Sequence, residues 1–256
     1  MPLLLAPAFF LIALLYAAVG FGGGSSYTAL LALAGTDYRI LPVLSLICNI
    51  AVTSGGCWRF ARAGHIPWRR AWPLVGIALP CAWVGGLLSV SQPQFTALLG
   101  LSLLVAGGIM LFYQPPLAVA EAAPEHKAPP IMLLPMAGFL GLLAGIVGIG
   151  GGIFLAPLLY LARWGDSRAI AGTASLFIVG NSFTGLSGQF ARLADDGTAI
   201  AALIGYWPLL PAVLVGGGIG SWLGAKKLPL IWMQRGTAVL ILMVAIRLIW
   251  LTVAGL

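Results

Sequence analysis

Eight apolar stretches recur along this chain of 256 residues, most of them close to the length that a helix needs to cross a bilayer. They fall at about 3–19, 40–57, 71–90, 95–113, 131–147, 169–190, 203–224 and 231–255. A spanning helix requires roughly 17 to 25 residues. Hydrophobic residues make up 61% of the chain and charged residues only 7%, which excludes an ordinary soluble domain. The sequence therefore predicts an all-α polytopic membrane protein of about eight hydrophobic helices.

The chain also contains an internal repeat. Gly20-Phe-Gly-Gly-Gly24 matches Gly148-Ile-Gly-Gly-Gly152, and Phe60-Ala-Arg62 matches Phe190-Ala-Arg192 further along. Matches that follow in the same order indicate a duplication. We interpret residues 1–113 and 131–256 as two transmembrane repeats, joined by a polar, proline-rich linker at 114–130.

The basic residues indicate that the two repeats are inverted relative to each other. Lys and Arg are enriched in cytoplasmic loops. The first repeat has its basic loop after the second apolar stretch, whereas the corresponding loop of the second repeat has Arg192 beside two aspartates. The remaining positive charges of the second repeat flank that loop, at Arg163, Arg168, Lys226, Lys227 and Arg235. This reversal requires an odd number of crossings in each repeat.

The glycine patches supply that odd number if residues 3–35 and 131–163 each form a re-entrant pair of half-helices. Consecutive glycines destabilise a helix, and Ser25 and Ser26 would cap the second half-helix. In transporters with inverted repeats, such breaks meet near the midplane and bind substrate. The alternative role of glycine is close helix packing, which we expect for Gly141-x-x-x-Gly145 and Gly216-x-x-x-Gly220.

The two glycine patches and the polar side chains expected at the same depth form the candidate substrate site. Half-helix N-termini attract anions because their backbone N–H groups are unpaired. The predicted substrate-binding residues are Gly22, Gly23, Gly24, Ser25, Ser26, Asn49, Thr53, Gly150, Gly151, Gly152, Thr173, Ser175, Asn181 and Gln189. Asn49 and Asn181 have the alternative role of bonding a neighbouring helix. Arg59 and Arg62 are expected to draw anions to the cytoplasmic mouth.

The distribution of ionisable residues excludes several other functions. All six acidic residues fall in loops or at helix ends, which argues against a proton relay through buried carboxylates. Coupling to sodium through carbonyls and hydroxyls, or movement of an anion down its gradient, stays open. There is no His/Cys ligand spacing and no nucleophile–base pair, so we expect no metal site, no cofactor and no enzymatic activity. The expected partners are a small anion and the lipid bilayer, not nucleic acid, and homo-oligomerisation stays open.

The sequence resembles the TauE/SafE family over nearly its whole length. The resemblance rests on the paired Gly-x-Gly-Gly-Gly patches, on Ala171-Gly-Thr-Ala-Ser-Leu176 and on Arg59-Phe-Ala-Arg-Ala-Gly-His65. It implies a permease of the bacterial inner membrane that exports sulfite, sulfoacetate or related organosulfonates, with export favoured over uptake. The first repeat departs from the second, since Ala29 stands where the second has Pro157.

A second interpretation is a non-transporting accessory or assembly subunit of a respiratory or sulfur-metabolism complex. Such a subunit needs a large polar or aromatic docking surface. The short loops of this sequence offer none.

Overall fold

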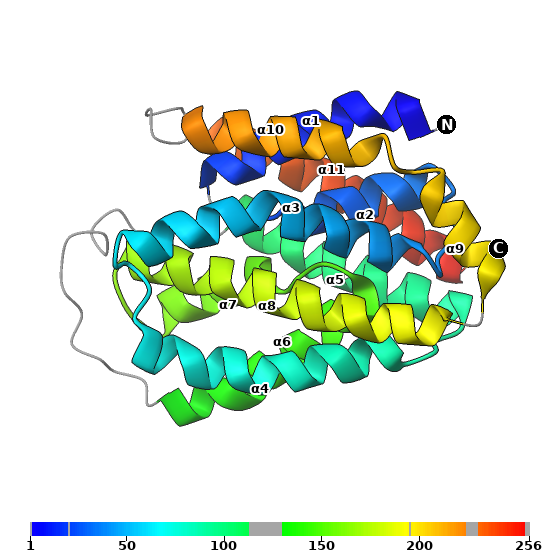
Figure 1. Ribbon diagram of the computed structural model, residues 1–256. Coiled ribbons are helices and arrows are strands. Elements are labelled where there is room, and N and C mark those ends of the chain that lie inside the picture. Colours follow the sequence, from blue (N-terminus) through cyan, green and yellow to red (C-terminus); the bar gives the residue numbers. More distant parts are fainter. Residues whose placement is uncertain (1, 20, 113–129, 195, 224–229, 254–256) are drawn as a thin grey trace.

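The computed structural model describes residues 2–19, 21–112, 130–194, 196–223 and 230–253, and all regular structure in these ranges is α-helical (Figure 1). The helices are α1 (Pro2–Val19), α2 (Gly24–Leu33), α3 (Leu41–Arg62), α4 (Trp68–Leu87), α5 (Gln92–Phe112), α6 (Pro130–Val147), α7 (Gly152–Leu161), α8 (Ser167–Leu193), α9 (Gly197–Ile204), α10 (Leu209–Leu223) and α11 (Leu230–Val253). Eight of them correspond to the predicted apolar stretches. The predicted all-α fold is confirmed.

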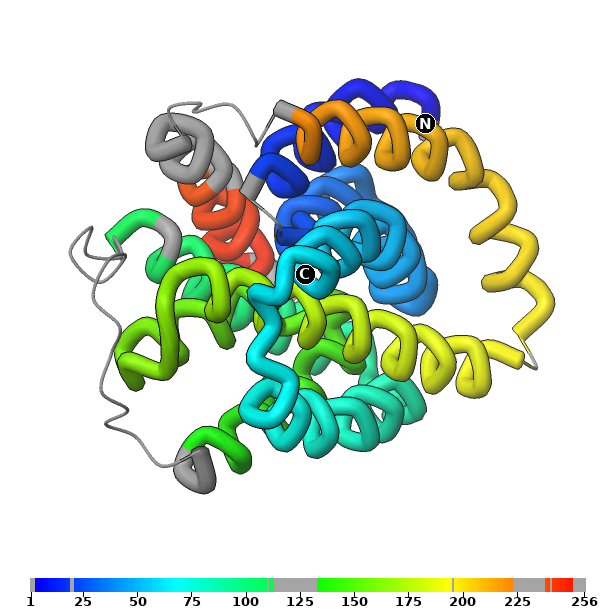
Figure 2. Tube along the Cα trace, turned by 60° about the vertical axis from the view of Figure 1, so that its left-hand side comes forward, coloured from blue at the N-terminus to red at the C-terminus, as the bar shows by residue number. Residues whose placement is uncertain are grey.

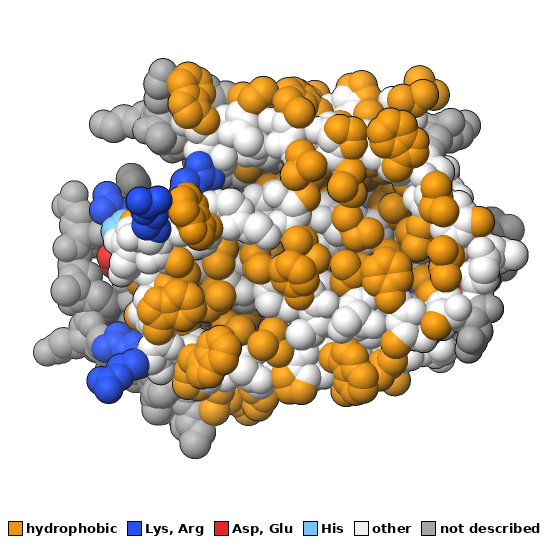
Figure 3. Space-filling model, viewed as in Figure 1, with side chains coloured by type: hydrophobic (Ala, Val, Ile, Leu, Met, Phe, Trp, Pro, Cys, Tyr) orange, Lys and Arg blue, Asp and Glu red, His pale blue; other side chains and the backbone are white. Residues whose placement is uncertain are grey.

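Several of these helices are suited to cross a membrane. Leu41–Arg62, Gln92–Ile109 and Ser167–Leu193 are each long and apolar enough to do so, and α9 with α10 forms a fourth candidate span bent by 53°. Figure 3 shows hydrophobic side chains spread over the side of the molecule, while Lys and Arg gather at one end. Large apolar residues such as Leu101, Phe139 and Met243 are more than half exposed, as lipid-facing residues are. The chain is a polytopic membrane protein.

One boundary differs from the prediction. The helix expected at 203–224 begins only at Leu209, and a separate helix, α9, precedes it. Asp196 starts α9 as its N-cap, because its carboxylate accepts a hydrogen bond from the backbone N–H of Ala199. Pro208 lies just before α10 and disfavours helical geometry in the residue that precedes it. A strong cap and a proline therefore divide what the apolar pattern suggested was one helix.

The helices pack in pairs that join the first part of the chain to the second. α1 lies along α10, α4 along α6, and α5 against α11, while α3 and α8 cross the centre (Figure 2). Each pair takes one helix from residues 2–112 and one from residues 130–253. The two parts are therefore interlocked. The predicted linker lies outside the described residues except for Pro130, at which α6 begins.

Corresponding helices run in opposite directions. In Figure 1, α1, α3 and α5 run from right to left, whereas α6, α8 and α11 run from left to right. The α1–α2 hairpin enters and leaves at the right-hand end, and the α6–α7 hairpin at the left-hand end. Inverted repeats require this antiparallel correspondence, and each hairpin leaves three further crossings in its part of the chain.

The glycines predicted to serve packing each face a backbone carbonyl of the partner helix. Gly141 and Gly145 of α6 face Ala78 and Ala82 of α4, and Gly216 and Gly220 of α10 face Phe10 and Leu14 of α1. A Cβ at Gly141 would lie only 2.5 Å from the Ala78 oxygen, and a Cβ at any of the other three would lie closer still. The packing prediction is confirmed for both glycine pairs.

Basic residues from both parts of the chain lie at one end of the molecule. Arg59 and Arg62 end α3, Arg69 and Arg70 begin α4, and Arg168 begins α8, all exposed and all at the left-hand end in Figure 1. Lys226, Lys227 and the side chain of Arg235 lie outside the described residues. Lys and Arg are enriched in cytoplasmic loops of membrane proteins, so this basic end is the one expected to face the cytoplasm.

Candidate functional site

Both glycine patches interrupt a helix. α1 ends at Val19 and α2 begins at Gly24, while α6 ends at Val147 and α7 begins at Gly152. Gly23, Gly148, Gly150 and Gly151 have φ angles of 79°, 81°, 79° and 78°. This left-handed conformation is costly for a residue with a Cβ, which explains the glycines. The prediction of a broken helix at each patch is confirmed.

The prediction that Ser25 and Ser26 cap α2 is wrong. Gly23 occupies the N-cap position, and its carbonyl accepts hydrogen bonds of 3.0 Å from the N–H groups of Ser26 and Tyr27. The two serines lie inside the first turn and are buried. The hydroxyls of Ser26 and Tyr16 lie 2.9 Å apart and form a hydrogen bond. The left-handed glycine makes α2 begin before the serines, so they lie within the helix. Rather than capping α2, Ser26 links it to α1 through Tyr16.

The two breaks meet at the side chain of Asn49 on α3. A Cβ at Gly150 would lie 2.8 Å from Asn49 Nδ2, and Cβ atoms at Gly22 and Gly24 would overlap the same amide. Gly24 also faces the backbone carbonyl of Ile149, which belongs to the other break. Glycine is therefore required at these positions because backbone from both breaks closes directly around one polar side chain.

Several polar atoms at this meeting point have no hydrogen-bond partner among the described residues. They are Asn49 Nδ2, Asn49 Oδ1 and Thr53 Oγ1 on α3 and Ser182 Oγ on α8, all on residues with at most 1% of their surface exposed. Thr53 lies against Gly22, and Ser182 lies against Gly150. Buried polar groups are normally paired, and leaving one unpaired costs about 1–3 kcal/mol. We call Gly22, Gly24, Asn49, Thr53, Gly150 and Ser182 the tip cluster.

The other predicted residues of α8 lie at varying distances from this cluster. Asn181 is buried with both amide atoms unpartnered and is the neighbour of Ser182 in the chain. Thr173 is also buried with an unpartnered hydroxyl, but nine residues before Ser182, about 13 Å along the helix. Ser175 is buried on the same helix.

The remaining glycines of the two patches contact mainly apolar groups. Gly23 lies against Ile12 and Tyr16, Gly151 against Phe177, and Gly152 against Ile178. They set the course of the backbone at each break rather than lining the tip cluster.

Gln189 is held away from the tip cluster by the protein itself. Its Nε2 donates a 2.7 Å hydrogen bond to the carbonyl of Gly145, and its Oε1 accepts one from Arg192. The last carbonyls of a helix lack partners within it, and the turn at Gly148 ends α6 three residues after Gly145. Gln189 therefore supplies the missing donor where α6 ends inside the protein, beside the buried Val147. The sequence analysis assigned Gln189 to the substrate site. Its hydrogen bond to the carbonyl of Gly145 joins two helices and is visible only in the tertiary structure.

A hydroxyl pair supports the first break. The single hydroxyl hydrogen of Thr28 is shared between the carbonyl of Gly24, 2.7 Å away, and the hydroxyl of Ser45, 2.9 Å away. Ser45 in turn donates to the same carbonyl at 3.1 Å. Ser45 stands out in the sequence because Ser45-Leu46 recurs as Ser175-Leu176, but nothing in the sequence pairs it with Thr28.

Comparison with known proteins identifies the family. The family described as "Sulfite exporter TauE/SafE" matches residues 5–248. The chain belongs to the TauE/SafE family. A relative from Sinorhizobium fredii, "Probable membrane transporter protein y4hK", is 32% identical over 247 residues, which cover 96% of this chain and 97% of that protein. No solved structure matches the chain. This TauE/SafE protein is therefore a multi-pass membrane transporter rather than an enzyme.

The electrostatics of the tip cluster in this TauE/SafE transporter favour an anion. The N-termini of α2 and α7 both lie at the cluster, and the first N–H groups of a helix carry a partial positive charge. Among the described residues, the carboxylates of Asp37, Asp166 and Asp196 all lie before or at the start of a helix near the ends of the molecule. No described carboxylate opposes a negative ligand at the cluster.

The two arginines expected at the cytoplasmic mouth are exposed at the C-terminal end of α3. Arg59 donates a 2.9 Å hydrogen bond to the carbonyl of Ser221 at the end of α10. The guanidinium of Arg62 lies 5.3 Å from the centre of the Trp58 ring. Both belong to the basic end, where positive charge raises the local concentration of anions.

Proposed function

We propose that this TauE/SafE transporter moves a small sulfur-containing anion, namely sulfite, sulfoacetate or a related organosulfonate, out of the cell across the bacterial inner membrane. The family description names sulfite export, and the electrostatics of the tip cluster are compatible with an oxyanion. The basic end then faces the cytoplasm and collects the anion through Arg59 and Arg62.

The observation that carries this proposal is the set of unpartnered polar atoms at the N-termini of two half-helices. Asn49 Nδ2 and the hydroxyls of Thr53 and Ser182 are hydrogen-bond donors, and sulfite and sulfonate oxygens are acceptors. Neutral donors hold an anion less tightly than a buried cation would, which suits a site that must also release it. An anion bound there would satisfy groups that the protein leaves unpaired.

The location of the cluster suits alternating access. Asn49, Thr53 and the first break come from one part of the chain, and Ser182 and the second break from the other. A movement of one part against the other would therefore expose the cluster first to one side of the membrane and then to the other, as in transporters built from inverted repeats.

The test is a flux measurement with the full chain in liposomes. Sulfite and sulfoacetate flux would be measured with and without a sodium gradient and with an imposed membrane potential. We expect saturable anion flux that Ser182→Ala reduces at least about tenfold, the equivalent of one lost hydrogen bond to a charged group. Ser187→Ala, at an exposed serine of the same helix, is the matched control and should leave flux unchanged. Absence of flux for any small anion from folded wild-type protein would overturn the proposal.

A further inference from the structure

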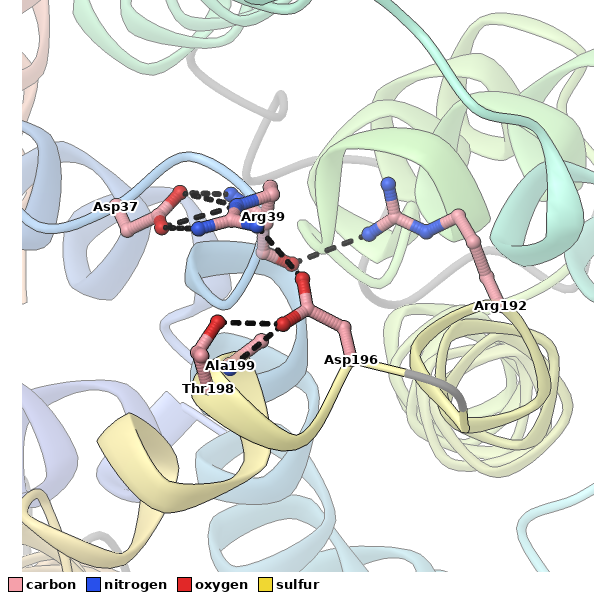
Figure 4. Close-up of polar contacts among 6 residues, drawn as sticks. All are labelled: Asp37, Arg39, Arg192, Asp196, Thr198 and Ala199. Carbon is pink, nitrogen blue, oxygen red and sulfur yellow. Dashed lines mark hydrogen bonds and ion pairs between the residues drawn. The ribbon is translucent and has the colours of Figure 1, made fainter.

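A charged network lies at the end of the molecule opposite the basic end, around the start of α3 and the start of α9 (Figures 1 and 4). Arg39 forms ion pairs with Asp37 at 2.7 Å and with Asp196 at 2.6 Å. The hydrogen bond from Arg39 is the main cause that lowers the pKa of Asp37, while the hydroxyl of Thr198 is the main cause that lowers the pKa of Asp196. Both carboxylates are therefore ionised and already paired with Arg39.

Arg192 lies at the end of α8. Among the described residues, all of its hydrogen-bond partners are neutral groups. Its Nη2 donates to the backbone carbonyl of Arg39 at 3.1 Å and to Gln189 Oε1 at 2.5 Å. Its Nε is buried and has no hydrogen-bond partner in the described part of the chain. Asp195 lies outside the described residues. A partly buried guanidinium whose described partners carry no charge keeps its attraction for anions, and the low dielectric strengthens that attraction.

The position of Arg192 places it between the tip cluster and the outer surface. It follows Ser182 by ten residues on α8, about 15 Å along the helix axis. The C-terminal end of α8, which carries Arg192, lies opposite the C-terminal end of α3, which carries Arg59 and Arg62 (Figure 1). Through Gln189, Arg192 is also connected to the carbonyl of Gly145, just before the second helix break.

We propose that Arg192 is a second anion contact of the transport path, which binds a sulfite or sulfonate group on its way between the tip cluster and the outside. The Nε and Nη2 groups form one edge of the guanidinium, and such an edge holds two oxygens of one oxyanion. The anion takes the free Nε and displaces Gln189 Oε1 from Nη2. This inference rests on the proposed function, and it makes Arg192 a residue that determines substrate selectivity on the outer side.

The test compares the two faces of the membrane. Half-saturating sulfite concentrations would be measured in vesicles of defined orientation for wild type, Arg192→Gln, Arg192→Lys and the control Arg168→Gln, which removes an exposed arginine from the other end of the same helix. For Arg192→Gln we expect an increase of about tenfold at the outer face and less than about twofold at the basic end. Arg192→Lys should fall between, because a single ammonium group cannot hold two oxygens side by side. Arg168→Gln should leave the outer-face value as in wild type; because Arg168 belongs to the basic end, only its outer-face value serves as the control.

Other results overturn the inference. An unchanged outer value in Arg192→Gln, or in Arg192→Lys if Arg192→Gln does not insert, excludes Arg192 as an anion contact. An equal change at both faces, accompanied by a lower melting temperature, shows a purely structural role. If wild type carries no anion at all, the proposed function fails, and this inference fails with it.

Discussion

Glycines serve two different purposes in this transporter. Gly145 and Gly220 lie within helices and face backbone carbonyls of neighbouring helices, whereas Gly22 and Gly150 lie at helix breaks and face the side chains of Asn49 and Thr53 or Ser182. A backbone carbonyl cannot move without moving its helix, while a polar side chain is able to rotate. We call the close contacts between paired helices, such as those of Gly145 and Gly220, the seams. The comparison indicates that the seams should determine stability and the breaks should determine transport. The predictions below test that division.

The largest effect is expected in the seams. Gly220→Ala places a Cβ against the carbonyl of Leu14, so α1 and α10 must separate, at a cost of about 3 kcal/mol or more. Thermal unfolding of the purified protein, followed by tryptophan fluorescence, measures the loss. Gly218→Ala is the matched control on the same helix, because a Cβ there meets open space and should be neutral or slightly stabilising. Equal melting temperatures for the two variants would show that the seam does not determine stability.

The next effect is expected at the first break. Gly22→Ala directs a Cβ into the side chains of Asn49 and Thr53, and Gly22 does not have a left-handed φ, so the backbone itself tolerates alanine. We expect folded protein that loses about 1 kcal/mol of stability, the lower limit for overpacking, while flux falls at least about tenfold. Liposome flux and thermal unfolding of the same preparation separate the two effects. Wild-type flux in this variant would argue that the breaks do not carry the anion.

These contrasts also show how far the sequence alone leads. The apolar stretches, the two breaks and the packing glycines were predictable because length, consecutive glycines and small-xxx-small spacing act locally or between neighbouring helices. Asn49 was recognisable as a candidate site residue because an amide in the middle of a span needs a partner or a function.

The remainder depends on contacts between residues far apart in the chain. Gly23 rather than a serine caps α2 because a left-handed backbone conformation outweighs the side-chain preference. Gln189 reaches the carbonyl of Gly145, 44 residues away, and Arg39 pairs with Asp196, 157 residues away. No local pattern encodes such partners. Neither the bond of Gln189 to the end of α6 nor the charged network around Arg39 could therefore be predicted from the sequence.

Two threonines near the first break provide a sharper test. The hydroxyl of Thr28 forms hydrogen bonds with Gly24 and Ser45, while that of Thr53 has no partner among the residues that the structure describes. Thr28→Val should therefore destabilise the protein by about 1 kcal/mol, whereas Thr53→Val should be neutral or stabilising by a similar amount. In flux, the order should reverse, with Thr53→Val the more impaired. If both variants lose stability equally, Thr53 is a structural residue and does not belong to the substrate site.

The smallest effect is expected at the charged network of Asp37, Arg39 and Asp196, which lies away from both seams and breaks. The pKa of Asp37 is lowered from its ordinary value of 3.8, so its contribution to stability is present above that value and is lost as the pH falls through the lower folded value. Asp37→Asn should lower the melting temperature by about 2 °C or less at pH 7, because exposed ion pairs contribute little. The difference from wild type should shrink below about pH 4 and then disappear. A large, pH-independent loss would contradict this expectation, since an effect that survives protonation cannot come from the ion pair of Asp37.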